Sequence, residues 1–264
     1  MKRYLKLFWR FVAVSFSDDS VFRFDFFTSI LHYLIYQAIF IIFWKSLLTF
    51  TADTLGDWTF PELAILSTFA LLASAIMEWF AGFLQLPEKV LQGDLDKYLC
   101  RPISPLFALL AEEVSAIDLL QQLFSGTLIV ILVAVIYEVP LAAPDVFAGL
   151  GFLFLGCLAM VLLQGCISML SFWLGDINRI HRIFWICREF ERYPVNLFPL
   201  WLRNALTWLI PVGLITTYPT LVFLGKDKGN LLYFWVAVTL VFAWSGIFAV
   251  MWRKALRRYE SFGG

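Results

Sequence analysis

Charged residues are scarce in this sequence of 264 residues: Asp, Glu, Lys and Arg make up 15% of it, whereas apolar residues make up 61%. A soluble globular domain typically has about a quarter of its residues charged and about half apolar. The mean hydropathy is +0.80. This balance excludes an ordinary water-soluble domain and predicts an integral membrane protein.

Residues that commonly carry enzyme chemistry are also few. Neither of the two histidines, His32 and His181, stands at a motif spacing from a Ser or Cys nucleophile or within a metal-binding cluster. A nucleotide-binding loop needs a glycine-rich turn ending in Lys-Ser or Lys-Thr, and the only remotely similar piece is Gly225 to Lys228. We therefore expect no catalytic site, no metal and no cofactor in this chain, and no nucleic-acid partner at its net charge of zero.

Cysteines number four, and all of them fall within apolar runs or on the side of the membrane expected to be cytoplasmic, so no disulfide is indicated. No cleavable signal peptide is expected either, because the first apolar run starts late and is long enough to remain as an anchor.

Six long apolar runs are present instead. Each reaches the roughly 20 residues that a helix needs to cross a bilayer core of about 30 Å. Their continuity is unlike the alternating strands of about ten residues that build a transmembrane barrel. We predict an all-α, polytopic membrane protein, with residues 1–264 forming one transmembrane domain. The expected spans are Phe26 to Leu48, Leu63 to Phe83, Ala116 to Tyr137, Val146 to Leu174, Asn204 to Leu224 and Leu231 to Trp252.

The positions of Lys and Arg predict the orientation of these spans, because positively charged loops stay in the cytoplasm. With both termini inside, all but three of the 20 Lys and Arg residues fall on the cytoplasmic side. The three exceptions are Lys45, Lys226 and Lys228. The fourth loop contributes Arg179, Arg182, Arg188, Arg192 and Arg203 to the cytoplasmic side. We expect a multi-pass protein of a bacterial plasma membrane with both termini in the cytoplasm.

Two segments outside the spans show helical periodicity. Residues 1–23 place apolar side chains at helical spacing from Leu5 to Phe16, with cations on another face. This pattern predicts an interfacial helix whose cations meet anionic lipid, although an ordinary positively charged flank would have the same placement. Residues 175–203 predict a second cytoplasmic interfacial helix, ending near Tyr193 because Pro194 disfavours helix in the residue before it.

The segment Gln92 to Pro105, QGDLDKYLCRPISP, interrupts the apolar sequence with charge. Gly93 is expected to end the helix that descends from the second span, and Asp94 to cap a new helix of about two turns. Arg101 and the proline after it would end that helix. The result is a compact helix held between two spans.

After this helix, Ser104 is expected to cap a further helix with Pro105 at its first position. The whole cytoplasmic loop covers residues 84–113. Such an element suits the transmission of force from a soluble partner, but a capped linker helix would have the same sequence.

Polar residues also occur inside or beside the predicted spans. Because a carboxylate at the bilayer centre costs about 2.5–3.5 kcal/mol on insertion scales, such residues are functional candidates. They would line a partly hydrated cavity, or else sit in interfacial water and hold helices together. The candidates are Glu78, Asp118, Gln121, Gln122 and Gln164.

Two prolines, Pro211 and Pro219, fall within the fifth predicted span. Each removes a helical hydrogen bond, so they should bend or break the helix. The span would then flex during transport, form a re-entrant turn near the outer face, or carry a static kink.

The loop sequence resembles that of a known family, the six-span permeases of type-2 ABC exporters. The resemblance extends roughly from Leu86 to Leu224. The residues that carry it are Gly93-Asp94-Leu95-Asp96, Tyr98-Leu99, Arg101-Pro102 and Pro105-Leu106, followed by Arg192-Tyr193-Pro194, Leu206 to Pro211 and Tyr218-Pro219.

The resemblance implies a permease that pairs with a second permease, identical or related, and with two cytoplasmic ATPase subunits that bind ATP and Mg²⁺. The coupling helix would sit in a cleft of the ATPase; its residues would be Gly93, Asp94, Leu95, Asp96, Tyr98, Leu99 and Arg101. Two other classes stay open. One is an ion-gradient-driven carrier that uses Asp118 or Glu78, and the other is a membrane-embedded enzyme acting on lipid.

Overall fold

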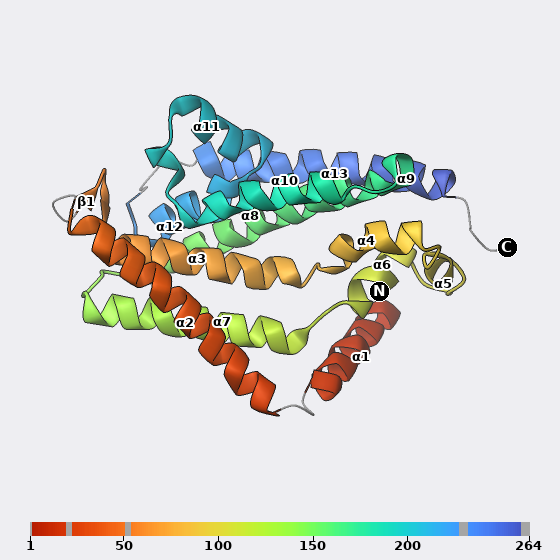
Figure 1. Cartoon of the computed structure of the whole chain (residues 1–264), viewed down its shortest axis with the longest axis horizontal. Coiled ribbons are helices and arrows are strands. Elements are labelled where there is room, and N and C mark those ends of the chain that lie inside the picture. The colour runs from red at the N-terminus through yellow and green to blue at the C-terminus, as the bar shows by residue number, and fades with distance from the viewer. Residues whose placement is uncertain (1, 20–22, 51–53, 227–231, 260–264) are drawn as a thin grey trace.

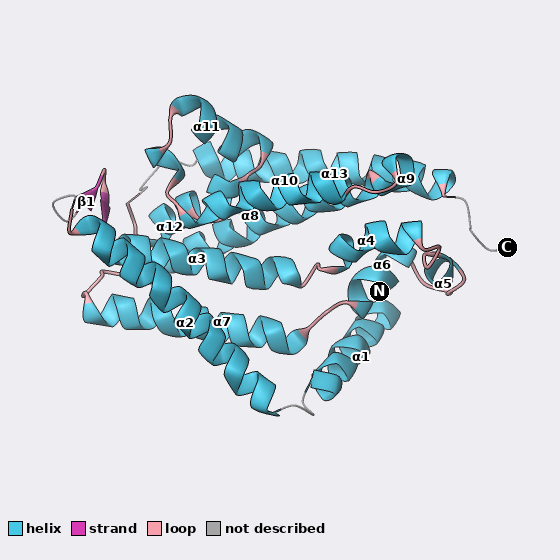
Figure 2. Cartoon of the chain, in the orientation of Figure 1, coloured by secondary structure: helices cyan, strands magenta, loops and turns pink. Residues whose placement is uncertain are grey.

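Helices make up nearly all of the structure, a computed structural model that describes residues 2–19, 23–50, 54–226 and 232–259 (Figures 1 and 2). Among these residues, extended structure is confined to the antiparallel strands β1 (Thr54–Leu55) and β2 (Trp58–Thr59). Their two-residue turn begins with Gly56 at a φ of +61°, a conformation that suits glycine and a tight hairpin. The predicted all-α class is confirmed.

The molecule has two ends, which Figure 1 places at left and right. The β-hairpin occupies one, the hairpin end; α5 (Asp96–Leu99) and the end of the last helix, near Arg258, occupy the other, the α5 end. Five helical segments between the ends are long and apolar enough to cross a membrane, and each overlaps a predicted span, although the last one extends past the predicted Trp252 to Arg258. They include α2 (Arg23–Leu48), α3 (Phe60–Glu78), α7 (Ala116–Ile136), α8 (Ala143–Met169) with α9 (Ser171–Leu174), and α13 (Leu232–Arg258).

The second span is shorter than predicted. We expected it to reach Phe83, but α3 ends at Glu78 and a separate amphipathic helix, α4 (Gly82–Leu91), follows. At its start α3 is fixed by a capping box, in which Thr59 and Glu62 each bond the other's backbone. The predicted start of the last span, Leu231, lies outside the described residues.

The fifth segment that runs between the two ends of the bundle is not the one that was predicted. Helix α10 (Asn178–Arg188), continued by the 3₁₀ turn η1 (Glu189–Arg192), runs back along α8 from the α5 end (Figure 1). His181 lies 3.3 Å from Ser168 near the α5 end of α8, whereas Tyr193 packs against Trp44 and Asn196 accepts a hydrogen bond from Trp58 at the hairpin end. The segment 175–203, which was predicted as an interfacial helix, thus extends from the α5 end to the hairpin end, and its helix ends before Tyr193-Pro194 as predicted.

The residues predicted as the fifth span, Asn204 to Leu224, form a bent pair of helices instead. The second helix is bent by 72° relative to the first, and Ile210 and Pro211 separate the two. The first helix of the pair is α11 (Leu200–Asn204), which continues as the π-helical turn η3 (Ala205–Leu209). The second begins with the 3₁₀ turn η4 (Val212–Leu214) and continues as α12 (Thr217–Phe223). Another 3₁₀ turn, η2 (Val195–Leu197), precedes the pair.

Both ends of this bent pair lie at the hairpin end. Leu197, just before it, meets Gly56 of the hairpin, and Lys226, just after it, donates a hydrogen bond to the Asp57 carbonyl at 3.0 Å. Its break reaches down to Gly156, roughly 20 Å along α8 from Ala143. The pair is thus a re-entrant hairpin, which is the alternative that the two prolines had left open.

The two prolines act differently in this re-entrant hairpin. Pro211 stands at the break, where its missing N–H and fixed φ stop the preceding helix. Pro219 instead lies in the first turn of α12, where no intrahelical N–H bond is lost. The predicted bend therefore occurs at Pro211 and not at Pro219.

The core of the bundle surrounds α3. Most of the apolar part of α3 is buried, whereas α2 and α13 lie on the outside with most of their side chains exposed to the surrounding medium. Gly156 of α8 lets the break of the re-entrant hairpin approach, because an added Cβ would lie 2.0 Å from the Leu214 carbonyl oxygen. Glycine at this position fixes how deep the re-entrant hairpin reaches.

Candidate functional site

The charged segment 92–105 forms a tight element at the α5 end (Figure 1). It follows α4 directly, and Gly93 turns the chain with a φ of +79°, which glycine adopts without strain. The helix α5 has only one turn, begins at Asp96 and shows no side-chain cap, so Asp94 is not its N-cap and the predicted two turns are wrong. Ser104 and Pro105 do begin the next helix, α6 (Pro105–Glu112), as predicted.

Three buried or half-buried side chains fix this element to its neighbours, and we name them the Tyr98 node: Lys89, Tyr98 and Glu113. The Lys89 ammonium donates to the Tyr98 hydroxyl at 2.8 Å and to the Glu113 carboxylate at 2.5 Å. Burial lowers the pKa of Lys89, but its bonds to Glu113 and Tyr98 outweigh that effect and the pKa lies above its usual value. Lys89 thus remains a cation at neutral pH and ties α4, α5 and the end of α6 together.

A second attachment joins the segment to the end of α13. The Tyr259 hydroxyl donates a hydrogen bond to the Gly93 carbonyl oxygen at 3.1 Å. Leu95 and Tyr98 are both fully buried beneath the turn. The predicted coupling residues therefore divide into an inner set that packs and an outer set that faces the medium.

The outer set consists of the predicted residues Asp94, Leu99 and Arg101, all exposed, and Lys97, which was not predicted, is exposed between them. Leu99 is 41% exposed, an unusual position for leucine in a charged turn. Lys97 and Arg101 both reach Glu112 of α6 at 3.3 Å. Burial raises the pKa of Glu112, but the bond from Lys97 outweighs it and the pKa falls below its usual value.

A second charged group lies far from the α5 end, between the two ends of the bundle. Arg188 of α10 and Glu191 of η1 form an ion pair at 3.3 Å, and each side chain is only 6% exposed. The Arg188 guanidinium also stacks on Trp185 at 4.7 Å. A buried pair of this kind removes both charges from water, so its geometry must offset a large desolvation cost.

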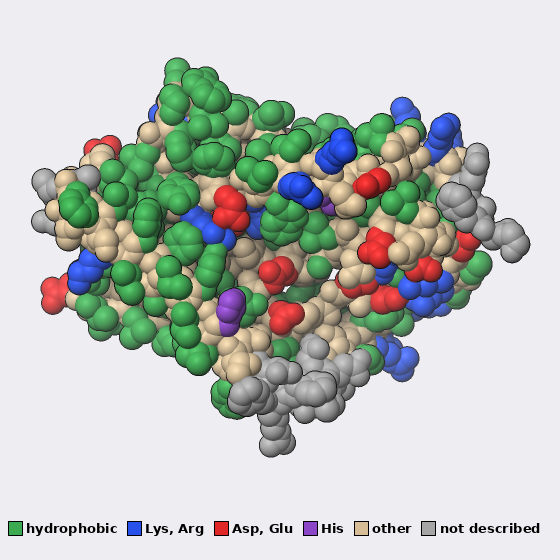
Figure 3. All heavy atoms as spheres, viewed as in Figure 1, with side chains coloured by type: hydrophobic (Ala, Val, Ile, Leu, Met, Phe, Trp, Pro, Cys, Tyr) green, Lys and Arg blue, Asp and Glu red, His purple; other side chains and the backbone are tan. Residues whose placement is uncertain are grey.

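Arg192 belongs to the same turn and extends across α2. Its guanidinium lies 5.1 Å from the Tyr36 ring centre and 4.9 Å from that of Phe40, and it pairs with Glu189 at 2.8 Å. Cation–π contacts of this length are stabilising, more so where water is excluded. Figure 3 shows acidic and basic side chains gathered in the middle of this face, between apolar surfaces.

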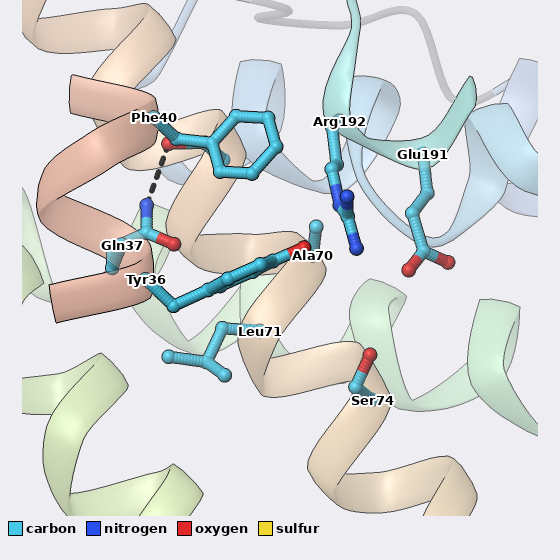
Figure 4. A pocket seen from close by; sticks show the side chains of 9 residues that line it. Tyr36, Gln37, Phe40, Ala70, Leu71, Ser74, Glu191 and Arg192 are labelled. Carbon is cyan, nitrogen blue, oxygen red and sulfur yellow. Dashed lines mark hydrogen bonds between the residues drawn. The ribbon is translucent and has the colours of Figure 1, made fainter. Parts of the chain in front are cut away.

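A small pocket lies at this point between α2, α3 and η1. In Figure 4, Arg192 and Glu191 point from η1 toward Tyr36 on α2 and Ser74 on α3. Gln37 donates to Ser67 at 2.7 Å on the pocket wall. We name this group the mid-bundle pocket. Its volume is only about 40 Å³, so it suits one polar group rather than a whole organic molecule.

The polar residues predicted for the spans do not form one cluster. Glu78 of α3 accepts a hydrogen bond from Gln122 of α7, with Asp118 one turn before it on the exposed surface. Gln121 is buried and donates to the Phe26 carbonyl at 3.4 Å, toward α2. Gln164 is buried on α8. Among the described residues, no group of three His, Cys, Asp or Glu side chains is arranged to hold a metal ion.

The sequence interpretation missed the mid-bundle pocket because it assigned Arg188 and Arg192 to a cytoplasmic loop. A signal was present: Glu189 and Glu191 both lie between the two arginines in the sequence, so the four charges cancel within residues 188–192. Opposite charges three residues apart on a helix pair with each other. Such a self-neutralised turn carries little information about membrane side.

Comparison with known proteins identifies one family. A family model described as "ABC-2 family transporter protein" matches residues 34–263, which is most of the chain. No curated protein and no solved structure matches this sequence.

Proposed function

This chain belongs to the ABC-2 transporter family, and on that premise we propose that it is the permease subunit of an ATP-driven exporter. It would pair with a second permease and with two cytoplasmic ATPase subunits, which hold the ATP and Mg²⁺. The α5 end would face the cytoplasm of a bacterial cell, because most of the chain's cations lie there. Arg188, Arg192 and Arg203 lie away from the α5 end, but most of the Lys and Arg residues are still at that end.

The observation that carries this proposal is the division of the segment 93–101 into two faces. Its inner face is rigidly attached through the Tyr98 node to α4 and α6 and through Tyr259 to α13. Its outer face presents Leu99 and several charged side chains to the medium, where a soluble partner has access to them. A movement of the outer face would therefore be transmitted to at least three helices, α4, α6 and α13.

The mid-bundle pocket would contribute to the translocation pathway. Four charged side chains and Gln37 midway along a membrane bundle cost free energy, and polar residues in such places mark functional sites. The face that carries them is also the place where a second permease would close a polar channel between two copies. Binding of ATP would draw the partner ATPases together, move the two segments 93–101, and open or close that channel.

The test compares two single variants on opposite faces of the segment. Leu99→Ser alters the outer face without touching a buried contact, whereas Tyr98→Phe alters the inner face and keeps the ring. After co-expression with its ATPase, the Leu99→Ser permease should lose ATPase co-purification and substrate-stimulated ATP hydrolysis at unchanged thermal stability. The Tyr98→Phe permease should retain ATPase binding. Normal ATPase binding and stimulation by Leu99→Ser would contradict the coupling role.

The same preparation distinguishes the competing carrier. In an ion-gradient-driven protein, transport into vesicles would proceed without ATP, and Asp118→Asn would abolish it while leaving the fold intact. Glu78 and Asp118 lie near each other on the exposed surface, so they are the pair to test. ATP-dependent transport that survives Asp118→Asn would exclude this mechanism.

A further inference from the structure

Helix α1 (Lys2–Asp19) spans an apolar cavity that no part of the described chain fills. Two hydrogen bonds hold the helix at points eleven residues apart. The Tyr4 hydroxyl accepts from the Ser104 amide at 3.2 Å, and the Ser15 hydroxyl accepts from the Ala116 amide at 3.3 Å. Helix α1 thereby connects the start of α6 with the start of α7.

The cavity beside α1 is a groove open to the surroundings, with a volume of about 590 Å³, which is within the usual range for small-molecule sites. Its lining is apolar, and we name it the α1 cavity: Trp9, Val12, Ala13, Trp79, Ala116, Leu119 and Leu120. Next to it, beyond Trp79, lies a second apolar space of about 190 Å³ beneath Phe8. An apolar chain would fit here, whereas a polar molecule would find no partner.

The depth of the α1 cavity matches the boundary between lipid headgroups and acyl chains. Trp79 directly follows the last residue of the apolar helix α3, and Ala116 is the first residue of α7. Tryptophan is enriched at this level of a membrane because its ring is apolar and its N–H polar. The cavity therefore opens where a phospholipid would enter it.

Cations border the opening. Arg3, Lys6 and Arg10 recur at three and four residues along α1, so they share one face. At 100° per residue, Trp9 and Ala13 of the cavity wall lie on the strip of helix next to Lys6 and Arg10. Among the described side chains, no carboxylate lies within ion-pair distance of these three cations. Their charge is available for an external anion.

We propose that the α1 cavity is a binding site for one anionic phospholipid, with an acyl chain under α1 and the headgroup on Lys6 and Arg10. The site would make the position of α1, and thereby of α6 and α7, dependent on membrane composition. This inference requires only that the chain lies in a membrane. It does not depend on the exporter function, so either proposal can fail without the other.

Native mass spectrometry of the full chain in detergent tests the site. The probe is an equimolar mixture of palmitoyl-oleoyl phosphatidylglycerol and palmitoyl-oleoyl phosphatidylcholine. We expect one retained lipid and a roughly tenfold preference for phosphatidylglycerol, because two cations near an anionic headgroup supply about that discrimination. Equal retention of the two lipids by the unmodified chain would overturn the proposal.

Two pairs of variants locate the site. Lys6→Gln with Arg10→Gln should abolish the preference, whereas Arg257→Gln with Arg258→Gln, also exposed at the α5 end, should keep it. Leu120→Trp should fill the cavity and reduce retention of both lipids, while Leu132→Trp on the same helix should not. An equal effect of the control variants would show ordinary surface lipid and would also overturn the proposal.

Discussion

Two segments of this chain are both rich in charged residues, but the charges of one are exposed and those of the other are buried. Residues 93–101 form a turn at the α5 end, where Lys97, Arg101 and Glu112 remain partly exposed. The turn around Arg188 and Glu191 lies inside the bundle, with both side chains 6% exposed. The difference shows that the number of charged residues in a segment does not predict whether the segment is buried, because opposite charges that pair within one turn can be buried together.

The largest expected effect comes from breaking the buried pair on one side only. Glu191→Leu leaves the Arg188 guanidinium buried without a carboxylate, and arginine does not lose its proton. We expect a loss of about 3–5 kcal/mol, measured as a lower melting temperature in detergent. Arg188→Met should cost less, since Glu191 can take up a proton and become neutral.

The double variant Arg188→Met with Glu191→Leu sharpens this prediction. Replacement of a buried pair by apolar side chains of similar volume is often neutral or stabilising, so most of the stability should return. Glu189→Gln is the matched control on the exposed side of the same turn and should cost less than about 1 kcal/mol. If Glu191→Leu and Glu189→Gln melted alike, the pair would not be buried as described.

The next effect concerns the depth of the re-entrant hairpin beside this region. Gly156→Ala places a Cβ 2.0 Å from the backbone oxygen of Leu214, which cannot rotate away as a side chain would. The expected cost is about 1–3 kcal/mol by overpacking. Gly151→Ala on the same helix meets nothing within 4 Å and should be neutral or slightly stabilising. Equal melting temperatures for the two alanine variants would place the break of the hairpin elsewhere.

Much of the fold could be predicted because it depends on local composition. Apolar runs of sufficient length gave the positions of α2, α7, α8 and α13, and Ser104-Pro105 gave the start of α6. These features need no knowledge of distant contacts. The helical class and the membrane setting follow from them directly.

The fifth crossing could not be predicted in the same way. The segment 204–224 is apolar enough to cross a membrane, whereas α10, which runs between the two ends of the bundle, is short and contains several arginines. What distinguishes them is long-range contact: Trp58 with Asn196, and Gly156 with Leu214. Of the candidate site, residues 93–101 do contain a short helix after Gly93, but its one-turn length and the burial of Tyr98 depend on contacts with α4 and α6. The mid-bundle pocket also depends on long-range contacts and was not foreseen.

The smallest expected effect is a pH dependence at the exposed end of the comparison. Because the pKa of Glu112 lies below its usual value, its ionised form stabilises the fold at any pH above the unfolded value of about 4.3. This contribution is lost as the pH falls through the folded pKa. The pair with Lys97 is partly exposed, so it should contribute less than about 1 kcal/mol.

Glu112→Gln should therefore melt slightly below the unmodified chain at pH 7, with the gap closing on acidification below pH 4.3 or on addition of salt. Glu88→Gln is the matched control, because the Glu88 carboxylate accepts a hydrogen bond at 2.9 Å from neutral Gln92 rather than from a cation. A gap that widened in acid would mean that Glu112 is held in its protonated form. The Lys97 and Arg101 contacts would then not be the ion pairs that fix the outer face of the segment.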